Sequence, residues 1–349
     1  MDLTKLNIGY LPYSNDFEKP GDKRRFVYYA NKRNLNFEVA DPSKKYDLVV
    51  LSQCADLSIW HDYDIGGAKV VYDLIDSYLS VPRKEIKGSL RGLAKFISRK
   101  SKYLRLNQWK AIESMCLRAD AVICSTEEQA KDIRPFCKNV HEILDVHSSV
   151  QNKIKEDYKS SKVFNIVWEG IADNTYSFQA LKSVFAQLEE KYEIALHFVT
   201  DLSYLKYLGK YGKTYTKDAL EGLSKRVYLY EWNEIMCSEI ISSSDLAIIP
   251  IDLNNPLVKG KPENKLLLFW RMGVPVIASA TPAYERAMKK AGLNMTCTNN
   301  KDWFHMLDKY ISSHESRELA GIAGKRIAEE DYSEEDILRR WDKVFESIS

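Results

Sequence analysis

Short apolar runs alternate with amphipathic segments along the first half of the chain. The runs at 6–11, 46–52, 68–73 and 120–125 are rich in Ile, Leu and Val and are bounded by polar or turn residues, which is typical of buried strands. Helical periodicity lies between them, roughly at 22–34 and 89–118, and Ser125 with Glu128 predicts a capping box at the start of a further helix. Buried apolar strands separated by helices predict a parallel sheet covered on both faces.

The alternation stops near residue 148 and restarts near 163. Strands are predicted at 164–170, 193–200, 226–232, 245–251, 274–279 and 293–298, and helices near 175–190, 233–243, 263–272, 283–291, 301–311 and 315–330. The predicted fold class is therefore α/β, with two doubly wound Rossmann-like domains facing a central cleft. We expect a first domain at 1–150, a polar linker at 151–162, a second domain at 163–332 and a C-terminal amphipathic helix at 333–349.

Composition narrows the class of protein. The chain of 349 residues exceeds the usual size of a single core, and its net charge of +2 gives no reason to expect a nucleic-acid partner. Six scattered cysteines without metal spacing predict buried free thiols in a reducing compartment. Because there is no signal-peptide pattern and no apolar run of about 18 residues, we expect a cytoplasmic protein.

No metal is predicted. The six histidines show no ligand spacing. Asp62 and Asp64 form an Asp-x-Asp pattern, but three residues match easily by chance and the pair lies in the first domain.

The segment 261–279, KPENKLLLFWRMGVPVIAS, predicts a buried helix whose N-terminal end is polar. Pro262 suits an early helical position, Leu266 to Met272 are apolar nearly all round, and Gly273 suits the C-terminal end. The amide groups at a helix start bind anions, and Lys259, Gly260 and Lys261 precede it. This pattern suits a diphosphate, although a surface helix start with solvated lysines fits it too.

Residues 226–284 resemble the donor-binding half of glycosyltransferase family 4, on the motifs VYLYEW, SSSDLAIIPI, KGKPENKLLLFWRMGVPVIAS and TPAY. The similarity extends more loosely to WEG at 168–170 and to ADAVICST at 119–126. It implies the two-domain GT-B fold, with a C-terminal helix that crosses back to the first domain. It also implies transfer of a hexose-type sugar from a UDP- or GDP-sugar to a glycan or lipid-linked acceptor in bacterial surface polysaccharide or glycolipid synthesis, with retained configuration.

The resemblance implies the donor site residue by residue. Lys261 or Lys265 would neutralise the leaving phosphate, Lys265 as a catalytic group. The base would lie against the loop near Tyr230 and Trp232. The remaining donor-binding residues are Gly170, Lys259, Gly260, Glu263 and Asn264.

The sequence departs from the family pattern at two positions. The family usually carries two glutamates eight positions apart, and those positions hold Gly260 and Leu268 here. The second glutamate normally holds the donor ribose, so that contact would come from elsewhere, with Glu263 as the candidate. A non-catalytic nucleotide-sugar or glycan-binding protein, or a partner subunit with a degenerate GT-B fold, is the alternative. A sugar-nucleotide epimerase sharing the fold is a second enzyme hypothesis.

Acceptor-side candidates lie in the first half. YDLIDSY at 72–78 ends a strand with Asp73 and Asp76. Either could orient an acceptor hydroxyl, or act as base if the reaction inverts the configuration, and Asp76 is the catalytic candidate. The segment 12–26 adds Ser14, Gly21, Asp22 and Arg25. Turn or cap carboxylates and exposed helical arginines are the structural alternatives.

Residues 83–110 hold ten Lys and Arg against one Glu. At helical spacing, apolar and basic residues fall on different faces, which is typical of a helix at an anionic membrane surface, although a solvated face on a packed helix fits as well. Since lipid-linked acceptors are common in the resembled family, we expect a peripheral protein at the inner face of the plasma membrane.

Overall fold

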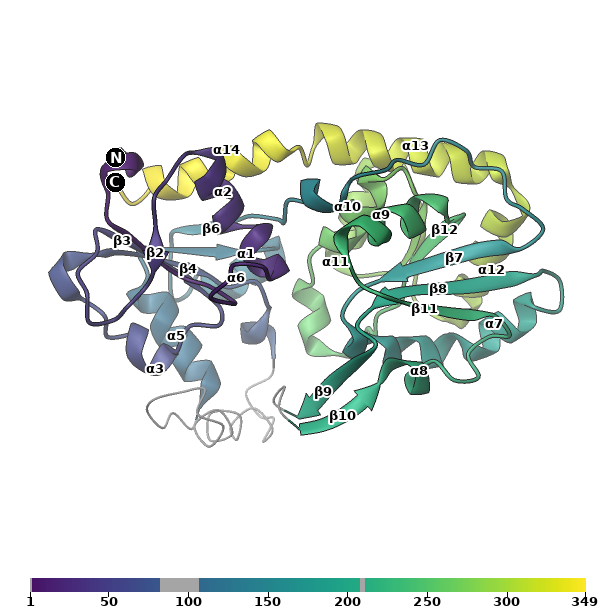
Figure 1. Ribbon diagram of the computed structural model, residues 1–349, viewed down its shortest axis with the longest axis horizontal. Coiled ribbons are helices and arrows are strands. Elements are labelled where there is room, and N and C mark those ends of the chain that lie inside the picture. The colour runs from purple at the N-terminus through teal and green to yellow at the C-terminus, as the bar shows by residue number, and fades with distance from the viewer. Residues whose placement is uncertain (1, 82–106, 208–210) are drawn as a thin grey trace. The chain divides into compact units, whose positions relative to one another are not determined.

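The computed structural model describes residues 2–81, 107–207 and 211–349. It divides into two compact units, each built around one parallel six-stranded sheet with flanking helices (Figure 1). Unit 1 comprises 1–146, 259–262 and 334–349, and unit 2 comprises 147–258 and 263–333. The predicted fold class of two doubly wound α/β domains is confirmed.

The sheet of unit 1 has the strand order β2-β1-β3-β4-β5-β6. Its strands are β1 (Ile8–Leu11), β2 (Glu38–Val39), β3 (Leu48–Ser52), β4 (Lys69–Asp73), β5 (Ala121–Cys124) and β6 (Val140–Glu142). Its described α-helices are α1 (Pro20–Lys23), α2 (Phe26–Lys32), α3 (Leu57–Trp60), α5 (Gln108–Arg118), α6 (Glu127–Ile133) and α14 (Glu334–Glu346). Of the basic segment predicted at 83–110, residues 83–106 lie outside the described residues.

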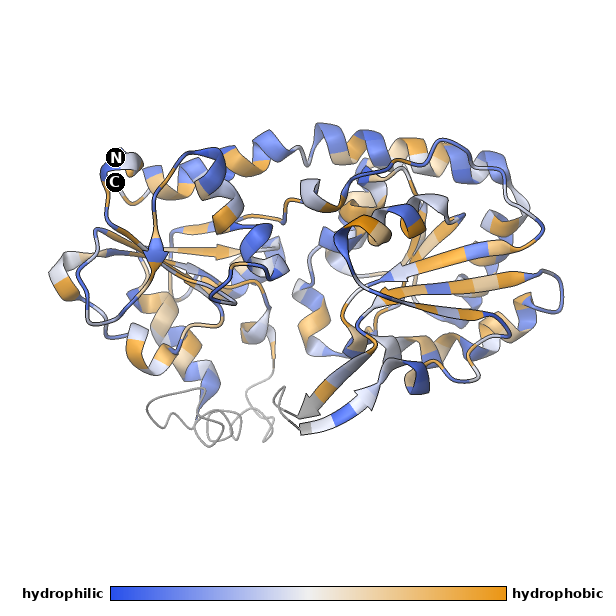
Figure 2. Ribbon diagram, viewed as in Figure 1, coloured by the Kyte–Doolittle hydropathy of each residue, from blue (hydrophilic) through white to orange (hydrophobic). Residues whose placement is uncertain are grey.

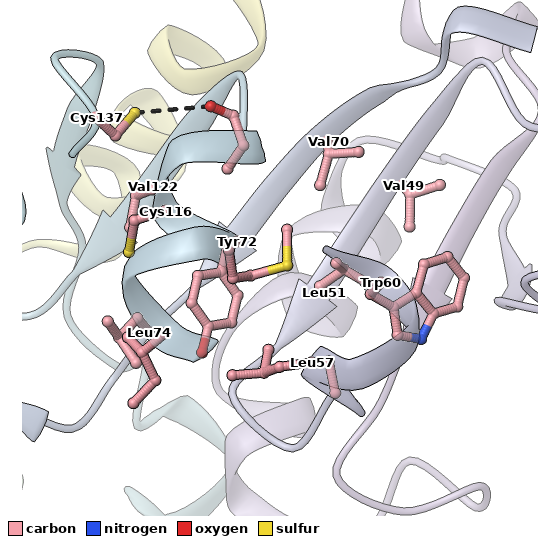
Figure 3. Packing of buried hydrophobic residues seen from close by; sticks show 14 of the residues in the cluster. Val49, Leu51, Leu57, Trp60, Val70, Tyr72, Leu74, Cys116, Val122 and Cys137 are labelled. Carbon is pink, nitrogen blue, oxygen red and sulfur yellow. Dashed lines mark hydrogen bonds between the residues drawn. The ribbon is translucent and has the colours of Figure 1, made fainter. Parts of the chain in front are cut away.

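Apolar side chains cover both faces of this sheet. On one face, Val49, Leu51 and Tyr72 pack with Trp60 of α3 and Met115 of α5 (Figure 3). The cluster on the other face is formed with α2 and α14 and includes Phe26, Tyr29, Trp341 and Phe345. The C-terminal helix therefore completes the core of unit 1, as the predicted crossover requires.

The sheet of unit 2 has the order β11-β8-β7-β12-β13-β14, and Figure 2 shows its central strands as largely hydrophobic. Its strands are β7 (Phe164–Glu169), β8 (Ile194–Thr200), β11 (Val227–Glu231), β12 (Leu246–Ile249), β13 (Val276–Ser279) and β14 (Thr296–Cys297). Its described α-helices are α7 (Lys182–Leu188), α8 (Thr216–Ala219), α9 (Glu234–Ser243), α10 (Asn264–Arg271), α11 (Pro282–Lys290), α12 (Asn300–Ser312) and α13 (His314–Glu330), and the 3₁₀ helix η5 (Ala172–Leu181) precedes α7. No prediction covers the antiparallel hairpin of β9 (Ser203–Tyr207) and β10 (Tyr211–Tyr215).

Two predicted helix starts are displaced. The helix after β5 is capped by Thr126, whose side chain accepts from the Gln129 amide at 3.3 Å, and not by Ser125. Helix α10 begins at Asn264 with Glu263 as its N-cap, so Pro262 precedes the helix. Its far end is as predicted, because Gly273 adopts a φ of 73° that suits glycine just beyond a helix.

The predicted linker at 151–162 contains no helix or strand and packs within unit 2. The Lys155 amide donates to the Met272 carbonyl at 2.8 Å, and the Tyr158 hydroxyl donates to the Gly273 carbonyl at 2.8 Å. These contacts fix the segment to the end of α10.

Candidate functional site

The first strand of unit 2 ends beside the start of α10. The Lys265 ammonium lies 4.6 Å from the centroid of the Trp168 ring, a cation–π distance. A Cβ added to Gly170 would lie 2.1 Å from Lys265 Nζ and 2.8 Å from the buried Trp168 ring. Glycine at 170 therefore allows the ammonium to rest at the carboxyl end of β7, where ligands bind in open α/β sheets.

Two aromatic candidates continue this edge of the sheet. The half-buried Trp232 donates from Nε1 to Glu169 Oε1 at 3.0 Å, so the ends of β7 and β11 are joined by a side-chain hydrogen bond. Tyr230 lies on a sheet face, where its ring stacks on His197 at 5.9 Å and its hydroxyl lies 3.1 Å from His197 Nδ1. Trp232 is thus the candidate directly tied to the strand end that carries Gly170.

The N-terminus of α10 has no side-chain cap hydrogen bond. Its N-cap residue Glu263 is buried, and its carboxyl group bonds Tyr332 and lies near Arg286. Burial raises the pKa of Glu263, and these neighbours oppose the shift. The helix therefore begins with the half-buried Asn264 and Lys265, while the carboxyl group of Glu263 is bound inside unit 2.

The other end of α10 is held by its last residue. The buried Arg271 guanidinium bonds the His147 ring through Nη1 and donates from Nη2 to the Tyr332 carbonyl at 2.7 Å. The Arg271 carbonyl accepts from Gln151 Nε2 at 3.1 Å. Helix α10 is thus fixed to the first and last segments of unit 2, near 147 and near 333, which are two of the points at which the chain passes to or from unit 1.

The residues before α10 belong to unit 1. The Thr126 hydroxyl donates to the Gly260 carbonyl at 3.3 Å, and a Cβ on Gly260 would lie 2.2 Å from Ser77 Oγ. Burial lowers the pKa of Lys261, and the Asp76 carboxylate opposes that shift. The structure thus brings Lys261 near Asp76, whereas Lys265 lies in unit 2 and Lys259 is exposed.

The acceptor-side carboxylate Asp76 is exposed. Its Oδ2 accepts from Gln53 Nε2 at 2.9 Å and from the Tyr78 hydroxyl at 3.2 Å. Two neutral donors orient this carboxylate, which leaves it the chemistry of a hydrogen-bond acceptor or base.

Three of the remaining acceptor-side candidates, Ser14, Gly21 and Asp22, lie in or beside the loop after β1. Asp22 is fully buried and accepts from the Tyr10 hydroxyl and from the Tyr13 and Ser14 amides at 2.7–3.1 Å. A Cβ on Gly21 would lie 2.6 Å from the Tyr13 ring, so a side chain at position 21 would require this ring to move. Asp22 therefore fixes the loop after β1.

Arg25 and Asp73 are paired with each other inside unit 1. The guanidinium donates from Nε and Nη2 to the two Asp73 oxygens at 2.7 and 2.6 Å, and from Nη1 to Asp145 at 3.0 Å. Burial disfavours the charge on Arg25, yet the two carboxylates outweigh burial and raise the pKa of the guanidinium. Because both side chains are buried, Asp76 is the only one of the two predicted strand-end carboxylates that the structure exposes.

The residues that join these groups were not predicted. Trp168 and Glu169 lie in the quoted motif WEG, but their contacts with Lys265 and Trp232 span more than 60 residues. Gln129 donates to the Leu74 and Asp76 carbonyls and thereby positions the loop after β4. The sequence could have indicated Gln129 only by its spacing, because it lies three residues after Thr126, which is the spacing of a capping box.

Across the described ranges, no group of three or more His, Cys, Asp or Glu could hold a metal ion. All six cysteines are free thiols, and five of them are buried. No described helix is long and apolar enough to cross a membrane.

No protein-family model matches the chain, and no curated protein matches it. Solved structures do. Anabaena HepE in complex with UDP and glucose is 13% identical, with 98% of this chain and 100% of that chain covered at a TM-score of 0.64. A glycosyltransferase from Rickettsia africae is 13% identical over 92% of this chain and 87% of that chain, with a TM-score of 0.60.

TarM is 14% identical over 85% of this chain at a TM-score of 0.58, and the match covers 54% of TarM. The chain therefore spans about half the length of TarM. These likenesses establish the GT-B fold. Membership of glycosyltransferase family 4 and the roles of the site residues stay predictions.

Proposed function

We propose that the protein is a glycosyltransferase that moves a hexose-type sugar from a UDP- or GDP-sugar to a glycan or lipid-linked acceptor. The observation that carries the proposal is the Lys265 ammonium seated on Trp168 against Gly170, at the start of a helix without a side-chain cap. The shared fold with HepE, whose structure holds UDP and glucose, supports it over the whole chain.

In the proposed reaction the bond between the sugar anomeric carbon and the diphosphate oxygen breaks. The acceptor hydroxyl forms the new bond to that carbon and loses its proton. Lys265 and the first amides of α10 stabilise the negative charge on the departing diphosphate, so no metal is needed for this step. With retention of configuration, the departing phosphate accepts the proton, and Asp76 orients the acceptor hydroxyl.

We further propose that the acceptor belongs to bacterial surface polysaccharide or glycolipid synthesis, at the inner face of the plasma membrane. Family resemblance supports the pathway. The basic segment 83–110 supports the membrane surface through its sequence alone.

A second candidate function is nucleotide-sugar or glycan binding without transfer. It is favoured by the two positions at which the resembled family carries glutamate. Leu268 is buried in the core, and Ser77 leaves no space for any side chain at Gly260. Neither position can therefore supply the carboxylate that the resembled family uses there.

Release of free nucleotide from a panel of UDP- and GDP-sugars separates the two functions. A transferase hydrolyses its nucleotide sugar slowly when water replaces the acceptor, and free nucleotide is released. We expect Lys265→Ala to abolish this release and Lys301→Ala, at an exposed position on α12, to leave it unchanged. Binding of a nucleotide sugar without any release, with or without candidate acceptors, would establish the binding protein instead.

A further inference from the structure

The hairpin β9–β10 is an isolated two-stranded sheet in unit 2 that reaches beyond the main sheet (Figure 1). Its register pairs Leu205 with Lys213, Tyr204 with Thr214 and Ser203 with Tyr215. Two-stranded hairpins are marginally stable in water unless another surface covers one face. An open face on this hairpin would therefore suit a further binding surface.

One face packs on unit 2 and the other is open. Because side chains alternate along a strand, Tyr204 and Thr214 share a face, which is half-buried on the side of the neighbouring helix η5. Leu205 and Tyr215 share the opposite face with Lys213, and they are 43% and 47% exposed. We call Leu205, Lys213, Tyr215 and the adjoining Lys217 the hairpin face.

The hairpin face combines apolar and cationic groups. Lys213 Nζ lies 5.1 Å and Lys217 Nζ 5.8 Å from the centroid of the Tyr215 ring. Residues 202–217 contain four Lys, four Tyr and three Leu but no Asp or Glu. Leu202, directly before β9, is also 42% exposed. An occupant of this face must accept apolar side chains and supply negative charge beside them.

We propose that the hairpin face binds the surface of an anionic phospholipid bilayer. Tyrosine and lysine side chains suit the headgroup layer, since each presents an apolar body and a polar end, and the leucines reach the acyl boundary. Basic residues are attracted to anionic headgroups, so the charge of the face is complementary to that surface. A nucleic acid would match the lysines but leave the leucines without a partner.

The position of the hairpin determines which edge of unit 2 would lie near the bilayer. The hairpin follows β8 directly, so it stands at the same strand-end edge of unit 2 as Gly170 and Lys265. Docking brings this edge to the bilayer, where a lipid-linked acceptor would be met. This consequence rests on the proposed function, whereas the bilayer contact itself does not.

An environment-sensitive fluorophore at position 205 tests the contact directly. The labelled variant is Leu205→Cys in a Cys54→Ser background, because Cys54 is the one exposed cysteine. The matched control is Thr214→Cys on the opposite face of the hairpin. With vesicles of phosphatidylcholine and phosphatidylglycerol in equal parts, we expect a blue-shifted emission at 205, little change at 214, and no shift with phosphatidylcholine alone.

Charge reversal tests the electrostatic half. We expect Lys213→Glu with Lys217→Glu to lower vesicle partitioning by at least roughly thirtyfold, and Lys301→Glu to leave it unchanged. Urea unfolding of each variant, followed by far-UV circular dichroism without vesicles, shows that the variants are folded and does not depend on the proposed function. No shift at 205, an equal shift at 214, or partitioning that survives charge reversal would overturn the proposal. So would displacement by a short RNA combined with no effect of Leu205→Ser.

Discussion

At the scale of single residues, the account depends on how Lys265 is held. Its ammonium is seated on the buried Trp168 ring and passes through the space that a side chain at 170 would occupy. A lysine held in this way reaches a ligand with less loss of side-chain entropy than a freely rotating surface lysine. Under the proposed function, this placement preorganises Lys265 to bind the diphosphate of the donor.

Removal of this charge should weaken nucleotide binding far more than stability. We expect Lys265→Ala to raise the dissociation constant of UDP or GDP roughly ten- to a hundredfold, because a hydrogen bond from a charged donor is lost. The loss of the cation–π contact should cost only about 1 kcal/mol of unfolding free energy. Calorimetric titration and urea unfolding measure the two effects, with Lys301→Ala as the control. Unchanged affinity in Lys265→Ala would remove Lys265 from the site.

The sequence could indicate which residue types line the site but not which of them are buried. Asp22, Arg25 and Asp73 lie at or after strand ends, as ligand-binding residues do. Only their contacts reveal that Arg25 and Asp73 bond each other and that Asp22 bonds the loop after β1. Lys261 and Lys265 are four positions apart and yet pack in different units, since Gly260 is fixed to Thr126 and Lys265 to Trp168. Long-range contacts of this kind leave no local pattern.

At the scale of elements, α10 is anchored at both ends. Glu263 at its start bonds the Tyr332 side chain, and Arg271 at its end bonds the Tyr332 carbonyl and the His147 ring. Along its length Trp270 packs so closely on α13 that a Cβ at Gly324 would lie 2.5 Å from the ring. A helix held in this way keeps its N-terminal amides in one place.

Arg271→Met keeps the volume of the side chain but leaves two buried acceptors without their donor. We expect the unfolding free energy to fall by about 2–6 kcal/mol, at about 1–3 kcal/mol for each buried unsatisfied group. Urea unfolding followed by far-UV circular dichroism measures the loss. Arg326→Met on the exposed face of α13 is the control, with an expected change within about 0.5 kcal/mol. Equal stability of the two variants would show that α10 is not held by Arg271.

Within unit 1, helix α14 is joined to the C-terminal end of α2 by an ion pair whose strength depends on pH. Asp342 accepts from Arg33 at 2.7 and 3.1 Å and from the Tyr29 hydroxyl at 2.9 Å, and these donors, Arg33 foremost, lower the pKa of Asp342. A lowered carboxyl pKa stabilises the fold above the ordinary value near pH 4 and ceases to do so as the pH falls through the folded value.

We therefore expect Asp342→Asn to lower the unfolding free energy by about 1 kcal/mol at pH 7, a modest value because the pair is one-third exposed. The difference from the parent protein should shrink as the pH falls below 4, where the parent carboxyl becomes protonated. Urea midpoints from pH 7 to pH 3 measure it, with the exposed Glu346→Gln as the control. A difference that grows towards low pH would contradict the assigned role.

Elements with strong periodicity could be predicted, and short or unusual ones could not. The long apolar strands were located to within a few residues, since burial on both faces leaves a continuous apolar run. Strands β2 and β6 span two and three residues, too few for any pattern. The hairpin was missed because its open face mixes Leu and Tyr with Lys, which resembles a loop as much as a strand.

At the scale of the whole molecule, each unit has a buried core of its own, and the chain passes between the units more than once. The segment 259–262 packs with unit 1 and is followed directly by α10 of unit 2, while α14 completes the core of unit 1. The C-terminal helix could be predicted from its apolar stripe, and its return to the first domain could be predicted from the family resemblance. The position of 259–262 could not be predicted, because it depends on contacts of Gly260 with Ser77 and Thr126, which are distant in the sequence.

The central claim is that unit 2 binds a nucleotide diphosphate sugar at the junction of β7 and α10. Hydrogen exchange, followed by mass spectrometry with and without a saturating UDP- or GDP-sugar, locates the bound ligand along the chain. We predict slower exchange in peptides covering 168–173 and 263–268 and unchanged exchange at 12–16. Protection confined to unit 1, or protection of neither peptide by any nucleotide sugar that binds, would contradict the account.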